Sequence, residues 1–261
     1  MNAGALDFGI LWPAFVAGLL VLATHVPLGM QVLERGIVFI DLAIAQIAGL
    51  GVIAADSLGF PEHGVAVQAA AVCASLLGAA LLTWTERRAA RYQEALIGVL
   101  FVLAACLGIL LLARNPHGGE HLQELLAGQI LWVGPPQLAG LAVITALLLA
   151  TMALGWMRRL GRFGFYAAFA VAVTASVQLV GVYLVFSSLI VPALGTVRWR
   201  GRQRLFAGFA LGVFGYATGL ALSALFDLPS GPTIVCALAA SALLCSLRWQ
   251  ARGEALQPRR L

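Results

Sequence analysis

The architecture of this chain can be worked out from the stretch VQLVGVYLVFSSLIVPALGTVRWRGRQR (Val177–Arg204). Its apolar run contains Gly181, meets Pro192 and ends in four arginines: Arg198, Arg200, Arg202 and Arg204. Proline lacks an N–H group and clashes with the preceding turn, so we expect a helix to bend or end near Pro192. The change from apolar to cationic residues is typical of a segment that leaves a bilayer at its cytoplasmic face.

Two interpretations of this cationic end remain open. A segment that lies against the inner face of a membrane offers a place where a soluble partner protein could push. Alternatively, the arginines only anchor the next helix among anionic lipid headgroups.

The composition excludes a soluble protein. Of the 261 residues, 61% are hydrophobic and 10% are charged, whereas soluble domains carry about 25% charged residues. The mean hydropathy is +0.96. We therefore expect an all-α, polytopic transmembrane helix bundle that forms one domain over residues 1–261. Asp7, rather than a basic residue, precedes the first apolar run, so we expect that run to be kept as a helix.

Lysine and cysteine usage limits the chemistry. All 16 basic residues are arginine, so the chain cannot supply a P-loop, which needs a lysine. If ATP drives this protein, another polypeptide binds it. The cysteines show no CxxC spacing, and we expect small buried hydrophobic residues rather than disulfides or metal ligands. They are Cys73, Cys106, Cys236 and Cys245.

Apolar segments of about 17–25 residues can cross a bilayer, and the sequence predicts about nine of them. The seventh is short, and the number falls to eight if it is re-entrant. The segments are 9–31, 37–56, 64–84, 95–113, 136–157, 163–180, 182–198, 205–226 and 231–248.

The arginines indicate the orientation. With the N-terminus outside, 15 of the 16 arginines fall on the cytoplasmic side, and Arg114 alone falls outside. Cytoplasmic loops carry the excess of arginine, so we expect the C-terminus in the cytoplasm. The outer loops would then be acidic and histidine-bearing, as suits a surface that meets cations, although depletion of arginine from outer loops also explains this. The outer residues are Asp56, Glu62, His63, His117, Glu120, His121, Glu124 and Asp227.

One outer loop contains the spacing H-x-x-E-H from His117 to His121. This spacing formally matches a zinc-protease signature. Ligands at that spacing must share a helical face, and Gly118–Gly119 is a poor helix interior, so we reject a protease. A weak external metal-capture patch remains possible.

Few polar residues fall inside the predicted spans. Asp41 and Gln46 both lie in the second span, and ionisable groups at membrane depth are functional candidates. They are five residues apart and point in directions about 140° different on an ideal helix, so they do not form a pair. For His25 and Gln178 we expect hydrogen bonds between helices.

Five pieces, in order, resemble the integral membrane permeases of bacterial ABC importers for zinc, manganese and iron. PLGMQVLERGIVFIDLAIAQIAGLG (Pro27–Gly51) is similar to the first loop and second helix of that family. The other pieces are EALIGVLFVLAACLGILLL (Glu94–Leu112), LLAGQILWV (Leu125–Val133), LVGVYLVFSSLIVPALGTV (179–197) and DLPSGPTIV (Asp227–Val235).

The resemblance implies a permease subunit of an importer in the bacterial cytoplasmic membrane. Two copies would pair as a homodimer within membrane lipid, two cytoplasmic ATPases would dock on them, and an extracytoplasmic binding protein would deliver zinc or manganese. No tightly bound cofactor and no nucleic-acid partner are expected. The coupling residues that would enter a groove of the ATPase are Pro192, Ala193, Leu194, Val197 and Arg198.

The second helix departs from the family pattern. Without gaps, the family's aspartate aligns with Leu42, its histidine with Gln46, and its glycine with Asp41. An amide oxygen is a harder and weaker ligand than imidazole, better suited to magnesium, calcium or manganese than to zinc. Asp41 and Gln46 remain the candidate metal-path residues.

Three functions compete with an ABC importer of a bare metal ion. The same kind of importer could carry a metal chelate or a small cofactor, which the lost histidine allows. A proton-driven secondary transporter could use Asp41 as a relay and would need no ATPase. A membrane enzyme is disfavoured because no Ser–His or multi-His constellation falls at one depth.

Overall fold

The chain folds as a bundle of α-helices in a computed structural model that describes residues 8–60, 64–112 and 128–255. The described residues contain no strand. The long apolar helices are α1 (Phe8–Arg35), α2 (Ile40–Ser57), α3 (Val65–Ala89), α4 (Gln93–Leu112), α6 (Pro135–Ala153), α8 (Gly161–Val180), α9 (Val182–Gly195), α10 (Gly201–Phe226) and α11 (Ser230–Ala255). Short connectors are η2 (Ala90–Tyr92), η3 (Ile130–Trp132) and α7 (Trp156–Arg159).

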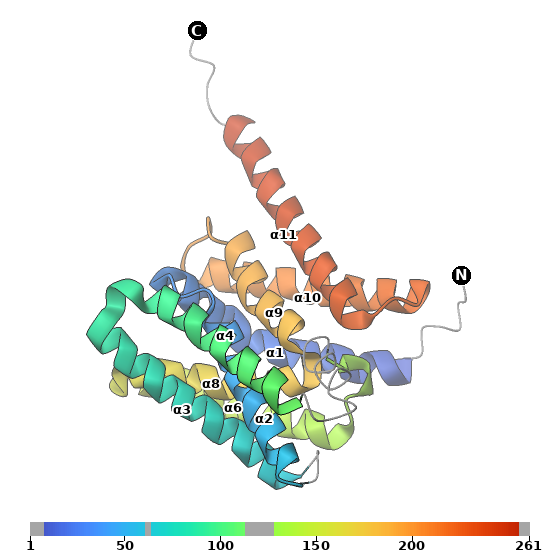
Figure 1. Cartoon of the computed structure of the whole chain (residues 1–261). Helices are drawn as coiled ribbons and strands as arrows, with labels where there is room; N and C mark the ends of the chain where they lie inside the picture. Colours follow the sequence, from blue (N-terminus) through green and yellow to red (C-terminus); the bar gives the residue numbers. More distant parts are fainter. Residues whose placement is uncertain (1–7, 61–63, 113–127, 256–261) are drawn as a thin grey trace.

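Each predicted apolar segment lies on one of these helices. By length and apolar character, 6 helical stretches could cross a membrane, and Val182–Gly195 and Ser230–Ser246 are shorter apolar helices. The stretch Val65–Leu112 is 48 residues long, but it contains two helices, α3 and α4. Figure 1 shows that they run in opposite directions from the turn at η2. The predicted number of about nine apolar segments therefore agrees with the helices of the described residues.

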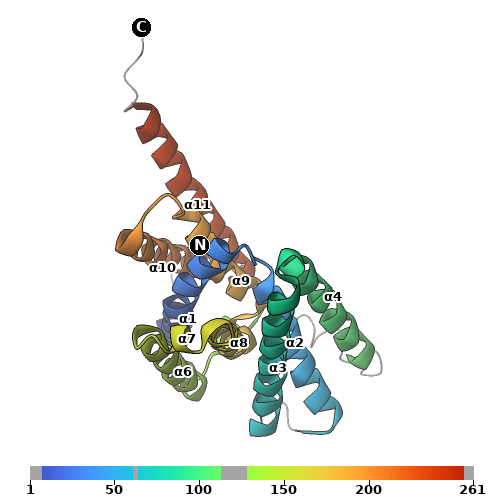
Figure 2. The same ribbon diagram turned by 90° about the vertical axis from the view of Figure 1, so that its left-hand side faces the viewer.

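The helices form two groups with α9 between them. Helix α2 packs against α3, α4 and α8, whereas α1 packs against α6, α9 and α10. Figure 2 shows α2, α3 and α4 on one side and α1, α6 and α10 on the other, and α8 packs against both α3 and α6. Helix α9 contacts members of both groups and also α11, so it occupies the centre of the bundle.

Gly181 separates α8 from α9, as predicted. Its φ angle is 79°, a left-handed conformation that glycine adopts readily and other residues rarely do. Pro192 does not end its helix at once, because α9 continues to Gly195. The hydroxyl of Thr196 then donates to the carbonyl of Pro192 at 2.7 Å, which satisfies one carbonyl at the helix end.

Close approach of helix backbones holds α1, α9, α10 and α11 together. Gly212 of α10 lies against Leu22 of α1, and Gly215 of α10 lies against Leu238 of α11. Gly29 of α1 lies against the backbone carbonyl of Leu189 in α9, where a Cβ atom would overlap it. Small residues allow such approach in membrane bundles.

The prediction that the cysteines are buried is wrong for three of them. All four are free, but Cys73, Cys106 and Cys236 are exposed on the surface of the single chain and Cys245 is half-buried. Apolar character alone does not distinguish a core helix face from a lipid-facing one, because lipid is as apolar as the core.

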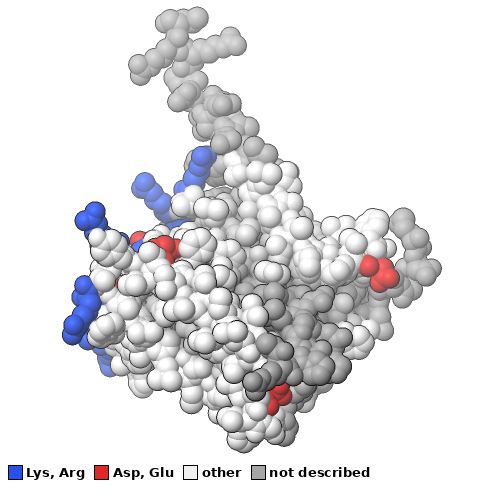
Figure 3. All heavy atoms as spheres, in the orientation of Figure 1, with Lys and Arg blue, Asp and Glu red and all other residues white. Residues whose placement is uncertain are grey.

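Arginines gather at one end of the bundle. They lie at the end of α1, at the η2 turn, around α7 and between α9 and α10. Figure 3 shows the basic side chains along one side and acidic side chains at the opposite end, with further acidic side chains among the arginines. The described arginines thus gather at one end, as the loop pattern predicts, and Glu34, Glu86 and Glu94 lie at the same end.

We expect Gly29→Ala to destabilise the fold. The added Cβ would collide with the backbone of α9, and overpacking typically costs about 1–3 kcal/mol. Gly140→Ala in α6 is the matched control, because nothing lies within 4 Å of that position and alanine favours a helix over glycine by about 1 kcal/mol. The midpoint of thermal unfolding in detergent measures both, and equal midpoints would contradict the close approach of α1 and α9.

Candidate functional site

The start of α2 is held by α4. The backbone N–H of Phe39 donates to Oε1 of Glu94 at 3.2 Å, and Glu94 lies in the first turn of α4. A carboxylate at the positive end of a helix is favourable. This contact therefore fixes the N-terminus of α2, the helix that carries the candidate path residues, against the N-terminus of α4.

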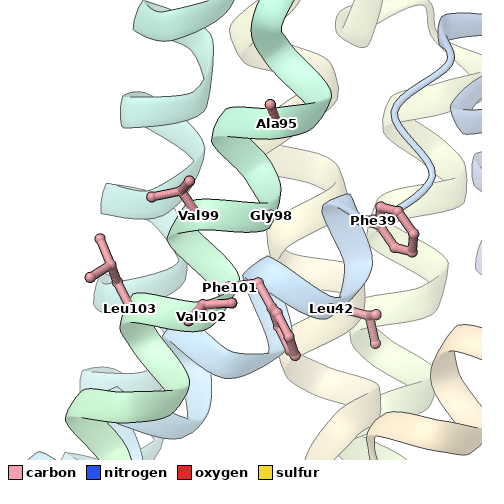
Figure 4. A pocket seen from close by; sticks show the side chains of 8 residues that line it. All are labelled: Phe39, Leu42, Ala95, Gly98, Val99, Phe101, Val102 and Leu103. Atoms are coloured by element: carbon pink, nitrogen blue, oxygen red, sulfur yellow. The ribbon is translucent and has the colours of Figure 1, made fainter.

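An apolar groove of about 630 Å³ lies between these two helices. Phe39, which precedes α2, and Leu42 of α2 line it on one side, and Figure 4 shows the α4 side chains Phe101, Val102 and Leu103 around it. All of its lining side chains are apolar. Leu42, the position that the resemblance aligned with an aspartate, thus lies beside α4 on the open side of the helix.

Gln46 lies on the same side of α2, one turn further along. It lines a small cavity of about 20 Å³ between α2, α4, α8 and α9, and is the polar side chain among its lining residues. Residues four apart on a helix share a face, which explains why Leu42 and Gln46 both lie toward α4. The cavity also reaches Val177 and Val182, which flank the break at Gly181.

Asp41 lies elsewhere on α2. Its side chain is fully buried at 0% exposure, and neither carboxylate oxygen has a hydrogen-bond partner among the described residues. Asp41 and Gln46 therefore lie apart in one chain, and their spacing predicts this separation. An unpartnered carboxyl group in a bundle interior is costly.

Hydrogen bonds between helices were expected for Gln178 and His25, and the structure shows one for Gln178 only. The amide of Gln178 in α8 accepts from the amide of Gln68 in α3 at 2.5 Å, which confirms a bond between helices. His25 instead bonds within its own helix, with Nδ1 at 2.9 Å from the carbonyl of Val21 and 3.0 Å from the hydroxyl of Thr24. The predicted bond of His25 to another helix is therefore wrong for Nδ1, and Nε2 has no partner among the described residues.

Within the described part of the chain, no three His, Cys, Asp or Glu side chains are placed to hold one metal ion. His117 and His121, the candidate external patch, lie outside the described residues. One copy of the chain therefore presents, in its described part, a polar position at Gln46 and a buried carboxyl at Asp41, but no assembled metal centre.

The predicted coupling residues divide into two sets. Pro192 and Ala193 are buried, whereas Leu194 and Val197 are 58% and 55% exposed. Arg198 is exposed beside them. The turn between α9 and α10 thus rests on a buried base and presents two apolar side chains and a cation outward.

Sequence reasoning missed the contacts that join this end of the bundle. Arg204 pairs with Glu34 at 2.9 Å and Arg162 with Glu86 at 3.6 Å. A buried cluster joins Gln93 to Thr85 and to the hydroxyl of Tyr166. One signal was available in the sequence, since Glu34 and Arg204 each stand at the helix end that disfavours their charge.

Comparison with known proteins identifies the family. The model described as the ABC 3 transport family matches residues 7–160 and 154–249. The chain belongs to this family. It is accordingly the permease subunit of a metal-type ABC importer. This subunit is a multi-pass inner-membrane protein and is not itself catalytic.

Relatives cover most of the chain. The high-affinity zinc uptake system membrane protein ZnuB of Haemophilus influenzae is 24% identical, with 87% of this chain and 93% of that protein covered. The manganese transport system membrane protein MntC of Halalkalibacterium halodurans is 26% identical, with 88% and 84% covered. An uncharacterized membrane protein of Synechocystis sp. is 29% identical, with 94% and 92% covered.

Solved structures share the fold. A chain of PsaBC from Streptococcus pneumoniae in complex with Fab has a TM-score of 0.73 at 20% identity, with 93% of this chain and 92% of that chain covered. A putative metal-chelate type ABC transporter in an inward-facing conformation has a TM-score of 0.70 at 15% identity, with 91% and 85% covered. At these identities the likeness shows the fold alone.

We expect the double variant Leu42→Asp plus Gln46→His to bind zinc more tightly than the wild-type protein. It places a carboxylate and an imidazole four residues apart on one helix face, and imidazole suits zinc better than an amide does. Zinc retained by the purified protein after gel filtration measures the binding. Uptake should slow, because release of the ion slows.

The single variants are the controls, because each adds only one of the two ligands. If zinc retention and uptake by the double variant both stay at wild-type levels, this face of α2 does not line the transport path.

Proposed function

We propose that this permease carries a divalent metal ion, zinc or manganese, across the bacterial cytoplasmic membrane. A separate cytoplasmic subunit hydrolyses ATP, because this chain has no lysine for a P-loop. An extracytoplasmic binding protein delivers the ion. The relatives named for zinc uptake and for manganese transport support this choice of cargo, and the arginine-rich end supports an outside N-terminus and a cytoplasmic C-terminus.

The turn between α9 and α10 carries the proposal of ATP-driven transport. It stands among the arginines, where a membrane segment meets cytoplasmic water, yet Leu194 and Val197 project more than half exposed. Exposed apolar side chains grouped at one place are typical of a surface that a partner covers. We assign this turn, with Pro192 and Ala193 as its buried base and Arg198 at its rim, to a groove of the ATPase.

The transport path runs along α2 in this proposal. Gln46 reaches the path directly, since it lies on the side of α2 that faces the small cavity. Asp41 contributes only after α2 moves, because its carboxyl group is buried in the single chain. Both residues would bind metal weakly at rest, which suits a path that must release its cargo.

The proposed importer contains two copies of this permease. One copy of the chain offers a single amide on the path side of α2, and a twofold axis would bring a second amide from the partner copy toward it. Two identical ATPases also require two equivalent docking turns, which a twofold pair of permeases supplies.

A metal chelate or a small cofactor is the second candidate cargo. The observation that favours it is the presence of Leu42 and Gln46 at the two positions where the resemblance implied an aspartate and a histidine. Membership of an ABC family removes the proton-driven secondary transporter. Uptake of zinc, manganese and iron, each free and chelated, by a deletion strain that carries this gene decides between the candidates.

We expect the double variant Leu194→Asp plus Val197→Asp to uncouple ATP hydrolysis from uptake. Two carboxylates would weaken an apolar contact with the ATPase, while the exposure of both positions spares the fold. Metal uptake should fall at least several-fold, with the amount of permease in the membrane unchanged on immunoblots.

The matched control is Leu154→Asp plus Leu160→Asp. These leucines are 67% and 61% exposed on the turns that flank α7 at the same end of the bundle. Uptake should stay near the wild-type level in this control. Normal uptake by the Leu194 and Val197 variant would instead assign the turn to the lipid headgroups.

We expect crosslinking in native membranes, with the ATPase present, to recover a permease dimer. The measurement is the mass of the crosslinked species on a denaturing gel. An unrelated membrane protein of similar abundance is the control for random collision. Recovery of monomer alone would contradict the homodimer.

A further inference from the structure

An ion pair joins the start of α10 to the end of α1. The start of α10 directly follows the turn between α9 and α10, which we call the coupling turn. Nη1 of Arg204, in the first turn of α10, lies 2.9 Å from Oε1 of Glu34, in the last turn of α1. The side chain of Arg204 is 13% exposed and that of Glu34 is 64% exposed. The pair therefore lies at the protein surface, with the arginine turned inward and the carboxylate reaching it from the water side.

Each of these charges stands at the wrong end of its own helix. The N-terminus of a helix favours anions and the C-terminus favours cations, yet Arg204 begins α10 and Glu34 ends α1. Local helix energetics therefore favour neither residue, whereas their attraction for each other across 170 residues of sequence stabilises both positions.

The end of α1 contacts α8 and leads directly into α2. Arg35 follows Glu34 and places its guanidinium 4.0 Å from the ring centre of Phe165 in α8. The chain then turns at Gly36, whose φ is 69°, and reaches Phe39, whose N–H is held by Glu94. A short turn therefore joins Glu34 directly to the first residues of α2.

We propose that the Glu34–Arg204 pair passes movement of the coupling turn to α2, and that both are positioning residues for transport. The inference rests on the proposed function of the α9–α10 turn. When the ATPase moves that turn, Arg204 moves with it and draws Glu34, the end of α1 and the start of α2. Because water reaches the carboxylate of Glu34, which is 64% exposed, the pair can break and re-form during each cycle.

The test uses the permease reconstituted in vesicles with its ATPase and binding protein. Free zinc and free manganese ions are the probes, and ion uptake and ATP hydrolysis are measured in the same vesicles. In Glu34→Gln and in Arg204→Gln, hydrolysis should continue near the wild-type rate, whereas ions carried per ATP hydrolysed should fall several-fold. The ATPase should co-purify with both variants as with the wild-type permease.

The charge-reversed double variant Glu34→Arg plus Arg204→Glu separates this role from a purely structural one. It restores the attraction and places each charge at the helix end that favours it, so the ratio of ions to ATP should recover. Arg204→Lys keeps the positive charge and should keep most of the ratio, which gives a second reading if a glutamine variant is not recovered from membranes.

Glu86→Gln is the matched control. It removes the other ion pair at this end, between Arg162 and Glu86 at 3.6 Å, which joins α8 to α3 and does not contact the coupling turn. The ratio should stay at the wild-type value in this variant. A fall as large as in Glu34→Gln would overturn the proposal, because any loss of surface charge would then have the same effect.

The outcomes distinguish this inference from the proposed function. If Glu34→Gln keeps the wild-type ratio while the Leu194 and Val197 variant is uncoupled, the docking turn stands and the link through Glu34 is overturned. If the glutamine variants are uncoupled and the reversed pair does not recover, the link is also overturned. If neither set of variants changes the ratio, the coupling function of the turn itself fails.

Discussion

The fold depends on the short central helix α9, which does not have the length to cross a bilayer by itself. Its 14 residues span about 21 Å at 1.5 Å per residue, against a hydrocarbon thickness of about 30 Å. Backbone at the ends of so short a helix must be shielded by protein or must reach a polar region. The structure meets this demand by enclosing α9, whose side chains are mostly buried among α1, α8, α10 and α11.

Enclosing α9 explains several other features. Gly29 lets α1 approach the α9 backbone closely, and Ser188 of α9 pairs its hydroxyl with that of Tyr216 in α10 at 2.8 Å. Gly181 lets the chain turn from α8 into α9 without a loop. The arginine-rich end of α9 then emerges from the core at Leu194, which is 58% exposed, so the turn that we propose as the docking site is attached to a largely buried helix.

Sequence reasoning found what the bilayer itself dictates. The apolar runs, the glycine break at Gly181 and the collection of arginines at one end all follow from length, conformational freedom and charge, which each residue carries with it. The exposure of the cysteines and the partner of His25 did not follow, because they depend on which side of each helix meets protein and which meets lipid. The same limit applies to Glu94, whose carboxylate holds the N-terminus of α2 across 55 residues of sequence.

The altered second helix shows how position on a helix sets what a residue can do. Moving a carboxyl group by one residue, from 42 to 41, turns it about 100° around the helix axis. In this structure that turn takes it from the apolar groove beside α4 into the bundle interior, where neither oxygen is satisfied by a described residue. A leucine is left on the open side and an amide one turn further along. The side of α2 that faces α4 is therefore less polar than the residue content of the helix implies, and Gln46 is the polar side chain that the described part of one chain presents there.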